Sequence, residues 1–415
     1  MSERVVVTGL GAITPVGNSV TDTWNSLVEG QSGIGKISLF DTDGFDVTIA
    51  GEVKDFRPED LLSFKEARRL DRFCQFALLA TREAIADSGL VIDETNSDEI
   101  GVIVGSGIGG IATLSEQIEV LRTKGPRRVS PFLIPMYIID LAAGQIAIAT
   151  GARGPNFGIV SACSTSAHAL GEAAEIIKRG DAKAIIAGGA EAPVVPLGLA
   201  GFANMKALST RNDDPQRASR PFDRERDGFV MGEGSGIVIL EAESHARGRG
   251  AHIYAELAGY GATDDAFHIT APSDGGEGAV RSMKIALRKA QCDAADVDYV
   301  NAHGTSTPLN DKLETEALKT VFGEHARSLA ISSTKSMTGH MLGAAGVVES
   351  IACIKSIEQG IVHPTINYEN PDPECDLDYV PNVARKRAVD VALTNSLGFG
   401  GHNASLVFRS YASDA

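Results

Sequence analysis

Short β-branched runs alternate with helical runs along the whole chain, and this alternation constrains the fold more than any other feature of the sequence. The strand-like runs are RVVVTGL, IGVIVGSG, KAIIAGG, GIVILEA, YVNAHG, LAISST and ASLVFRS. Between them, DRFCQFALLATREAIADSG and GAVRSMKIALRKA carry apolar residues at the three-to-four spacing of an amphipathic helix. Apolar strands separated by helices predict an α/β fold with buried sheets.

The order of these parts repeats in the second half of the chain. In the first half, a helix ending near Gly89 leads to the strand IGVIVGSG, and GIVSACSTSAHALGEAAEIIKRGD then supplies a strand, a small-residue turn and a helix. In the second half, SMKIALRKA leads to YVNAHGTS, and LAISSTKSMTGHMLGAAGVVESIACIKSIEQG repeats strand, turn and helix. We interpret this as a duplication, with halves at residues 1–250 and 251–415.

Charge and cysteine content exclude several classes of protein. The chain has 38 basic and 54 acidic side chains, which argues against general nucleic-acid binding. Its five cysteines are odd in number and form no CxxC pair, so neither a disulfide framework nor a zinc site is indicated. No run of about 18 apolar residues and no N-terminal leader is found, so we expect a cytoplasmic protein without a membrane span.

The segment GSGIGG, residues 105 to 110, matches a dinucleotide-binding pattern. Such a site also needs an acidic residue at a strand end about 20 residues later, where this chain reads RTKGPRRVSPF. We therefore interpret GSGIGG as a tight turn and expect no nucleotide cofactor.

A cysteine, two histidines and a lysine, residue types that can catalyse acyl chemistry, lie at turns or strand ends. Cys163 lies among small residues in GIVSACSTSAHALGEA, where a helix N-terminus would stabilise a thiolate and offer N–H groups to an oxyanion. His303 follows the strand YVN, and His340 lies five residues beyond Lys335. Two neutral imidazoles can donate to a developing oxyanion or enolate, so the set indicates covalent acyl chemistry on a thioester or an amide. The acceptor is left open.

The surrounding motifs resemble those of the β-ketoacyl-acyl-carrier-protein synthases of type II, the elongating condensing enzymes of the thiolase superfamily. They are SACSTSAHALGEA, PFDRERDGFVMGEGSGIVILE, VNAHGTSTPLNDKLET, SSTKSMTGHMLGAAG and NSLGFGGHNASLVF. The resemblance covers essentially the whole chain. It implies a thiolase-like duplicated fold in five α-β-α-β-α layers with two mixed sheets, a homodimer, and no cofactor.

The resemblance also implies a reaction. Cys163 would take an acyl chain from acyl carrier protein as a thioester, and malonyl carrier protein would lose carbon dioxide and attack it in fatty-acid elongation. His303 and His340 would hold the malonyl thioester oxygen, with Lys335 as electrostatic support and Glu349 as its ion partner. Which histidine assists decarboxylation is left open, and so is the acyl chain length, although Ile108 is compatible with longer chains.

Further roles are implied by the same resemblance. Phe399 would gate the cysteine, and its amide would complete the oxyanion hole on a loop made mobile by Gly398, Gly400 and Gly401. Gly400 would also lie beside the substrate. The other implied sites are the pantetheine arm (Thr305, Thr307), the acyl tunnel (Ile108, Phe202), a polar network behind His303 (Asp311, Glu314), a monovalent cation site (Asn301, Asn395, Ser396), and carrier-protein docking (Lys65, Arg68, Arg69, Lys206, with Arg127 and Arg128 as further candidates).

Other functions compete with this interpretation. A ketosynthase of a polyketide or other specialised pathway would use the same residues, and a non-catalytic acyl-binding relative would keep the tunnel with an unreactive Cys163. A degradative thiolase would lack the histidine pair. A papain-like hydrolase would need a Cys-His-Asn order with signatures that this sequence does not contain.

Overall fold

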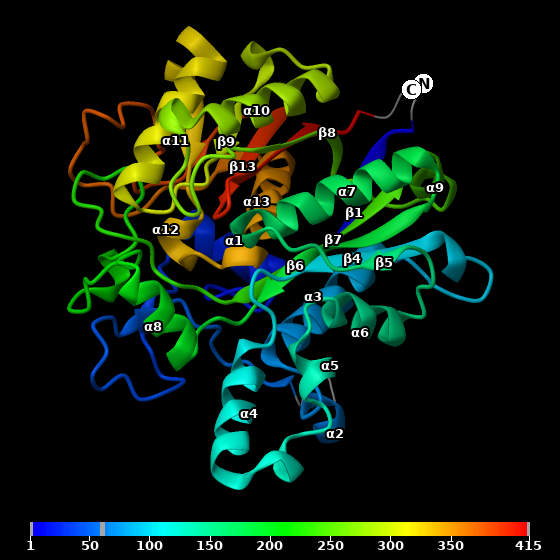
Figure 1. The fold of residues 1–415 in the computed structure, drawn as a ribbon. Helices are drawn as coiled ribbons and strands as arrows, with labels where there is room; N and C mark the ends of the chain where they lie inside the picture. Colours follow the sequence, from blue (N-terminus) through cyan, green and yellow to red (C-terminus); the bar gives the residue numbers. More distant parts are fainter. Residues whose placement is uncertain (1–2, 59–62, 413–415) are drawn as a thin grey trace.

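The computed structural model describes residues 3–58 and 63–412, and its main feature is a mixed sheet of ten strands (Figure 1). The strand order is β5-β4-β6-β7-β1-β8-β14-β13-β9-β10. In the first half of the chain the strands are β1 (Val5–Ile13), β4 (Ile100–Gly105), β5 (Asn156–Phe157), β6 (Ala184–Glu191) and β7 (Gly234–Ala242). In the second half they are β8 (Ala255–Asp264), β9 (Tyr299–Asn301), β10 (Ala330–Ser332), β13 (Val391–Gly398) and β14 (His402–Ser410).

The two halves of this sheet have the same topology. The order β5-β4-β6-β7-β1 corresponds strand for strand to β10-β9-β13-β14-β8, with the first three strands parallel and the last two antiparallel in each. Only two residue pairs, Val6 with Glu256 and Val7 with Ala255, join β1 to β8. The two expected sheets are therefore present as five-stranded units that meet edge to edge. This repeat supports a duplication, whose boundary at residue 250 stays a prediction.

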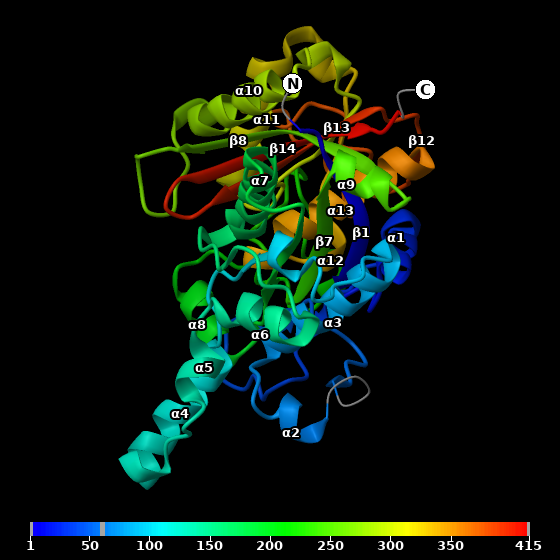
Figure 2. The same ribbon diagram turned by 90° about the vertical axis from the view of Figure 1, so that its right-hand side faces the viewer.

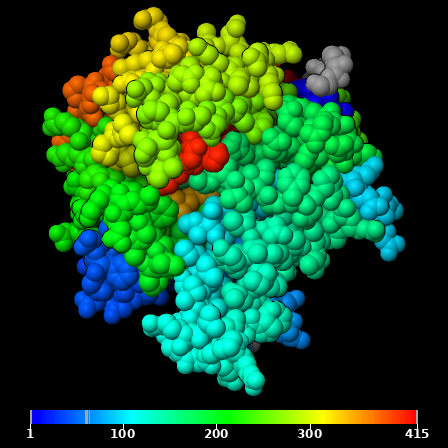
Figure 3. All heavy atoms as spheres, viewed as in Figure 1, coloured from blue at the N-terminus to red at the C-terminus, as the bar shows by residue number. Residues whose placement is uncertain are grey.

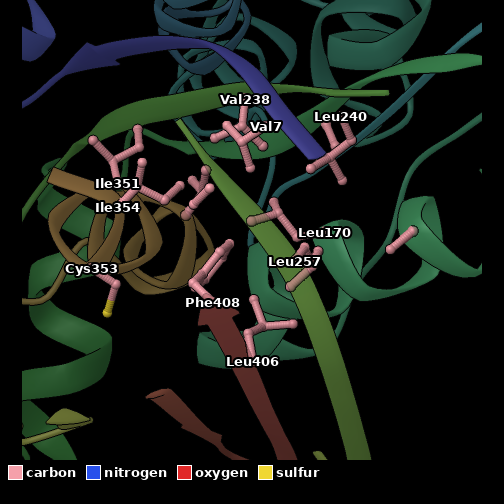
Figure 4. Close-up of a cluster of buried hydrophobic side chains, with 14 of the residues drawn as sticks. Val7, Leu170, Val238, Leu240, Leu257, Ile351, Cys353, Ile354, Leu406 and Phe408 are labelled. Atoms are coloured by element: carbon pink, nitrogen blue, oxygen red, sulfur yellow. The ribbon is translucent and has the colours of Figure 1, made fainter. Parts of the chain in front are cut away.

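Helices form three layers around these units, so the expected five-layer α-β-α-β-α arrangement is confirmed (Figure 1). The outer layer of the first unit is α3 (Arg72–Ser88) and α6 (Leu141–Thr150), and that of the second is α10 (Glu277–Ala290) and α11 (Pro308–Phe322). The central layer is α7 (Thr165–Arg179) and α13 (Ala345–Gln359). Figure 4 shows side chains of β1, β7, β8, β14, α7 and α13 meeting in the central core.

Strand alternation distributes side chains between these layers. On β7, Val238 and Leu240 point into the central core, whereas Ile237 and Ile239 pack against the α3 layer. Strands buried on both faces need apolar residues at successive positions, which is why they read as continuous β-branched runs in the sequence.

Glycines allow the same close approach of strand and helix in both halves. A Cβ atom on Gly11 of β1 would lie 1.9 Å from the Ala80 carbonyl oxygen of α3. A Cβ atom on Gly261 of β8 would lie 2.0 Å from the Ser282 carbonyl oxygen of α10. Any side chain at either position would force strand and helix apart, so both halves depend on glycine at equivalent places.

The remaining elements lie around this layered body. They are α1 (Val20–Glu29), α2 (Phe64–Ala67), α4 (Ile111–Lys124), α5 (Leu133–Tyr137), α8 (Pro196–Asn204), α9 (Glu243–Gly248), α12 (Lys335–Thr338), and the short strands β2 (Gly35–Lys36), β3 (Ile49–Ala50), β11 (Ile361–Val362) and β12 (Arg385–Lys386). Helices α4 and α5 form an arm that projects from the body (Figures 2 and 3). Within residues 3–58 and 63–412, no helix has the length and apolar character needed to cross a bilayer.

Candidate active site

Two equivalent turns, one from each half, lie at the centre of the site. The turn η4 (Ala162–Ser164) precedes α7 and carries Cys163, and the turn η9 (Leu342–Ala344) precedes α13. Ala162 has a φ of +50° and Leu342 a φ of +46°, a left-handed conformation that costs non-glycine residues on the order of 1–3 kcal/mol. Gly343 therefore occupies in the second half the position that Cys163 occupies in the first.

A cavity of about 380 Å³ reaches these turns. The predicted residues Cys163, His303, His340 and Phe399 all line it, although they come from four separate segments of the chain. Cys163 is only 8% exposed, so a substrate meets its sulfur through this cavity. The structure thus brings the predicted catalytic set together in one place.

The ring of His303 is oriented by a buried lysine. Lys335, 1% exposed, forms an ion pair with Glu349, and its Nζ lies 3.4 Å from Nδ1 of His303. An ammonium group can only donate, so Nδ1 of His303 accepts and its ring proton is on Nε2.

The ring of His340 has the same tautomer for a different reason. The backbone N–H of Leu342 donates to its Nδ1 at 3.3 Å, which again leaves the proton on Nε2. The His340 backbone is held against the segment before β7, where its N–H donates to the Val230 carbonyl oxygen at 2.7 Å. The two ring centroids are 5.4 Å apart with the rings nearly perpendicular.

Both imidazoles are neutral at pH 7. Burial lowers the pKa of His303 and of His340 well below the usual histidine value, and the nearby Lys335 ammonium lowers both further. Two neutral rings with protons on Nε2 are hydrogen-bond donors toward a substrate oxygen, without the cost of a buried imidazolium.

Cys163 departs from one sequence expectation. Burial raises the pKa of its thiol to about 11, although the Lys335 ammonium and the backbone N–H of Phe399 both lower it. The helix terminus was expected to stabilise a thiolate, but the loss of water around the sulfur outweighs it. The resting group is therefore a thiol, which must lose its proton as it attacks.

Phe399 lies in the turn between β13 and β14, which packs directly on the cysteine turn. The Ser164 hydroxyl lies 2.9 Å from the Ser396 carbonyl oxygen and 2.7 Å from that of His402. A Cβ atom on Gly398 would lie 2.8 Å from the Ser161 carbonyl oxygen. The positive φ angles of Gly400 and Gly401, +88° and +83°, explain why this turn needs glycine. Gly400, expected beside the substrate, is not among the residues that line the cavity.

A row of aromatic rings connects this turn to His340. Phe399 lies 6.4 Å from Phe202 between ring centroids, Phe202 lies 5.4 Å from Phe229, and Phe229 lies 5.3 Å from the His340 ring. Sequence reasoning assigned no role to Phe229, which is inside the motif PFDRERDGFVMGEG. Its contact with His340 crosses more than 100 positions of sequence, so no local pattern could have indicated it.

The expected substrate-binding residues are distributed along the cavity. Thr305 and Thr307 line it, with their hydroxyl oxygens 2.9 Å apart. Ile108 and Phe202 both pack against the apolar cluster that contains Cys163, but only Phe202 lines the cavity.

The expected polar network lies directly behind His303. Glu314 accepts the backbone N–H groups of His303 and Gly304, each at 2.8 Å, and burial raises its pKa to about 7. Asp311 accepts the backbone N–H of Phe222 at 2.8 Å and is 3.7 Å from Arg226. Glu314 therefore holds the backbone that presents His303, and Asp311 holds the neighbouring segment at Phe222.

The buried oxygens without a hydrogen-bond partner include Asn301 Oδ1 on β9, Thr394 Oγ1 and Ser396 Oγ on β13, and Glu349 Oε2 on α13. Oxygen donors of this kind fit a hard cation, so Asn301 and Ser396 fit the expected monovalent site. Asn395 fits it less well, because its Oδ1 accepts from Ser405 and its Nδ2 is directed at Glu314. Among the described residues, no group of three or more His, Cys, Asp or Glu is arranged to hold a metal ion.

The expected docking residues fall into two places. Lys206 lines the cavity, next to the exposed Met205. Lys65, Arg68 and Arg69 are exposed on or just after α2 and do not line it, and the Arg69 guanidinium lies 4.7 Å from the Phe132 ring centroid.

Comparisons with known proteins agree with this geometry. Residues 2–246 match the family described as beta-ketoacyl synthase, N-terminal domain, and residues 254–369 match beta-ketoacyl synthase, C-terminal domain. The chain is 56% identical to a 3-oxoacyl-[acyl-carrier-protein] synthase 2 of Synechocystis sp., over 99% of this chain and 98% of the relative. It is 53% identical to the protein of that name from Staphylococcus aureus, over 99% of both chains.

Solved structures of ketosynthases are also similar to this chain. A type II polyketide acyl-carrier protein in complex with its ketosynthase, bound to the hexaketide, matches with a TM-score of 0.91 and 39% identity, over 99% of this chain and 100% of that one. A beta-ketoacyl synthase from Burkholderia phymatum matches with a TM-score of 0.91 and 34% identity, over the same shares.

The thiol state of Cys163 can be tested by alkylation. Because the pKa of Cys163 is about 11, the rate of its reaction with iodoacetamide should rise about tenfold per pH unit from pH 7 to pH 10. Replacing Lys335 with Met removes a charge that lowers this pKa, so the variant should react more slowly at each pH. Adduct formation is followed by peptide mass spectrometry, and a plateau in the wild-type rate below pH 8 would show a preformed thiolate.

Proposed function

Because the chain belongs to the β-ketoacyl synthase family, we propose that it is a 3-oxoacyl-[acyl-carrier-protein] synthase of the elongating type, which condenses an acyl chain with a malonyl group in fatty-acid synthesis. One observation carries the proposal. A cysteine and two neutral imidazoles with protons on Nε2 line the same cavity.

In the first half-reaction, the Cys163 sulfur attacks the thioester carbonyl of acyl carrier protein. A new sulfur–carbon bond forms, the bond to the pantetheine sulfur breaks, and the thiol proton leaves with the pantetheine thiol. The backbone N–H groups of Cys163 and Phe399 stabilise the oxyanion, and the position of Phe399 N–H near the sulfur supports this role.

In the second half-reaction, His303 and His340 donate from Nε2 to the thioester oxygen of malonyl carrier protein. The carboxylate leaves as carbon dioxide, and the bonding electrons become an enolate that the two donors stabilise. The enolate carbon attacks the acyl thioester, a carbon–carbon bond forms, and the Cys163 sulfur leaves as a thiolate that takes up a proton from water. Burial keeps both rings neutral and therefore ready to donate, and the Lys335 ammonium reinforces this.

The degree of similarity favours fatty-acid elongation over a specialised pathway. Identity to curated 3-oxoacyl-[acyl-carrier-protein] synthase 2 proteins is 53–56%, whereas identity to the polyketide ketosynthase is 39%. An acyl-binding protein without catalysis would have no need of the tautomers described for the two histidines.

The residues around the catalytic set bind the substrate and a cation. Thr305 and Thr307 bind the pantetheine arm, and Ile108 and Phe202 border the acyl chain. Asn301 and Ser396 hold a monovalent cation whose charge would stabilise the buried strand ends. The enzyme works in the cytoplasm, which its five free cysteines support.

The chain acts as a homodimer. Large apolar side chains are exposed along β5, the arm and α6, and β5 is an edge strand that pairs only with β4. They are Ile118, Leu121, Phe132, Ile134, Ile148, Phe157 and Val160. An uncovered edge with so much exposed apolar surface is typical of a protein interface, and the oligomeric state in solution tests this.

Replacing Cys163 separates the two half-reactions. The Cys163→Ala variant should lose condensation by at least about a thousandfold, because no thioester can form. The Cys163→Gln variant should also fail to condense but should still release carbon dioxide from malonyl carrier protein, since both histidines are intact. Condensation retained in either variant, or no acyl adduct on wild-type Cys163 by mass spectrometry, would contradict the mechanism.

Docking of the acidic carrier protein can be tested with charge reversals. Lys65→Glu combined with Arg68→Glu should raise the KM for acyl carrier protein about tenfold at low salt, and leave the KM for an acyl-pantetheine thioester unchanged. The matched control is Lys284→Glu with Arg288→Glu, two exposed positions on α10 that give the same change of net charge. An equal effect on both substrates would show that α2 is not the docking surface.

A further inference from the structure

A buried carboxylate joins one of the two equivalent turns of the site, η9, to the loop after β4. Glu191, the last residue of β6, is fully buried. Its Oε1 accepts from the Ser106 hydroxyl at 2.6 Å and the Ile108 N–H at 3.0 Å. Its Oε2 accepts from the N–H groups of Gly107 at 2.7 Å and Gly343 at 2.9 Å. Four donors from two distant segments thus converge on one carboxylate, which is what a buried charge requires.

This carboxylate explains the decoy motif GSGIGG. The N–H groups that face a phosphate in a nucleotide-binding loop bind Glu191 here instead. Glycine is needed on both sides, because a Cβ atom on Gly107 would lie 2.8 Å from Oε2 and one on Gly343 would lie 2.6 Å from it. The two segments can approach Glu191 only without side chains.

The two segments serve different parts of the reaction. Ile108 packs against the apolar cluster that contains Cys163, with Phe202, but does not line the cavity, so we expect an acyl chain that extends from Cys163 beyond the cavity to press on it. Gly343 lies one residue after Leu342, whose N–H sets the tautomer of His340. A movement of the loop at Ser106–Ile108 is therefore transmitted through the Glu191 side chain to the turn η9, which orients His340.

We propose that Glu191 is a positioning residue that couples occupation of the acyl pocket to the orientation of His340, so that decarboxylation of the malonyl group responds to the chain held on Cys163. This rests on the proposed function. Glu191 touches no substrate, and it acts through Ile108 on one side and through Gly343 and Leu342 on the other.

The test uses alkyl groups of two lengths on Cys163 in place of the acyl chain. The full-length chain, with the partly exposed Cys292 replaced by Ser, is alkylated with iodoacetamide or with N-dodecyl iodoacetamide. The kcat/KM for decarboxylation of malonyl carrier protein is then measured for each form. In the wild type the two forms should differ on the order of fivefold, within the range of couplings between sites.

The Glu191→Gln variant keeps the shape of the side chain but replaces one acceptor oxygen with a donor group. At least one of the N–H groups then loses its partner. The ratio of kcat/KM for decarboxylation between the long-chain and short-chain forms should therefore fall to about one. Ser106→Ala removes one donor and leaves the carboxylate, so its ratio should lie between one and the wild-type value. It provides the test if Glu191→Gln does not fold.

A matched control separates coupling from stability. Glu241 is also fully buried, and its carboxylate accepts from Thr8 and Arg249 away from the cavity. Glu241→Gln should lower thermal stability and keep the wild-type ratio. A wild-type ratio of one, or a Glu191→Gln ratio equal to the wild type, would overturn the proposal. If no form released carbon dioxide, the proposed function itself would fail.

Discussion

The buried ion pair between Lys335 and Glu349 is the interaction on which the rest of the site depends. An ammonium group that is 1% exposed is tolerated only beside an opposite charge, which Glu349 supplies. The position of this charge then sets the state of the three reacting groups. The Lys335 ammonium donates to Nδ1 of His303 and lowers the pKa of both histidines. It also lowers the pKa of Cys163, against the effect of burial. One charge thus reinforces the neutral state that burial gives the two histidines, and it brings the nucleophile closer to ionisation.

Duplication explains how a site of this kind can be assembled. Each half places a strained turn before a central helix, and the two turns meet because α7 and α13 share the same central layer. The first half uses its turn for the nucleophile. The second half has Gly343 at the equivalent position, which leaves that turn free to bind Glu191 and to orient His340. Equivalent backbone geometry therefore serves two different purposes in one cavity.

Much of the fold was predictable because it depends on local patterns. The predicted strand runs and the helix that ends at Gly89 are present, since strands buried on both faces must be apolar and a left-handed cap favours glycine. The place of Cys163 in a turn before a helix was predictable for the same reason. The protonation of its thiol was not, because burial depends on residues that fold around it from both halves.

Long-range contacts set the limit of the sequence interpretation. Nothing local in AGGAEAP distinguishes Glu191 from a surface acid, because its donors lie more than 80 residues away on each side. The contact of Phe229 with His340 is of the same kind. The motifs could name the catalytic histidines, but only their neighbours in space reveal which ring nitrogen carries the proton.

The central claim is that His303 and His340 are neutral and protonated on Nε2 when the site is free of substrate. Nitrogen NMR of protein with labelled histidine rings tests this most directly, with signals assigned by His303→Gln and His340→Gln. Both residues should show a protonated Nε2 and an unprotonated Nδ1, without change from pH 5 to pH 8, because their pKa values lie well below the usual histidine value. A doubly protonated ring, or a proton on Nδ1 of either residue, would contradict the account.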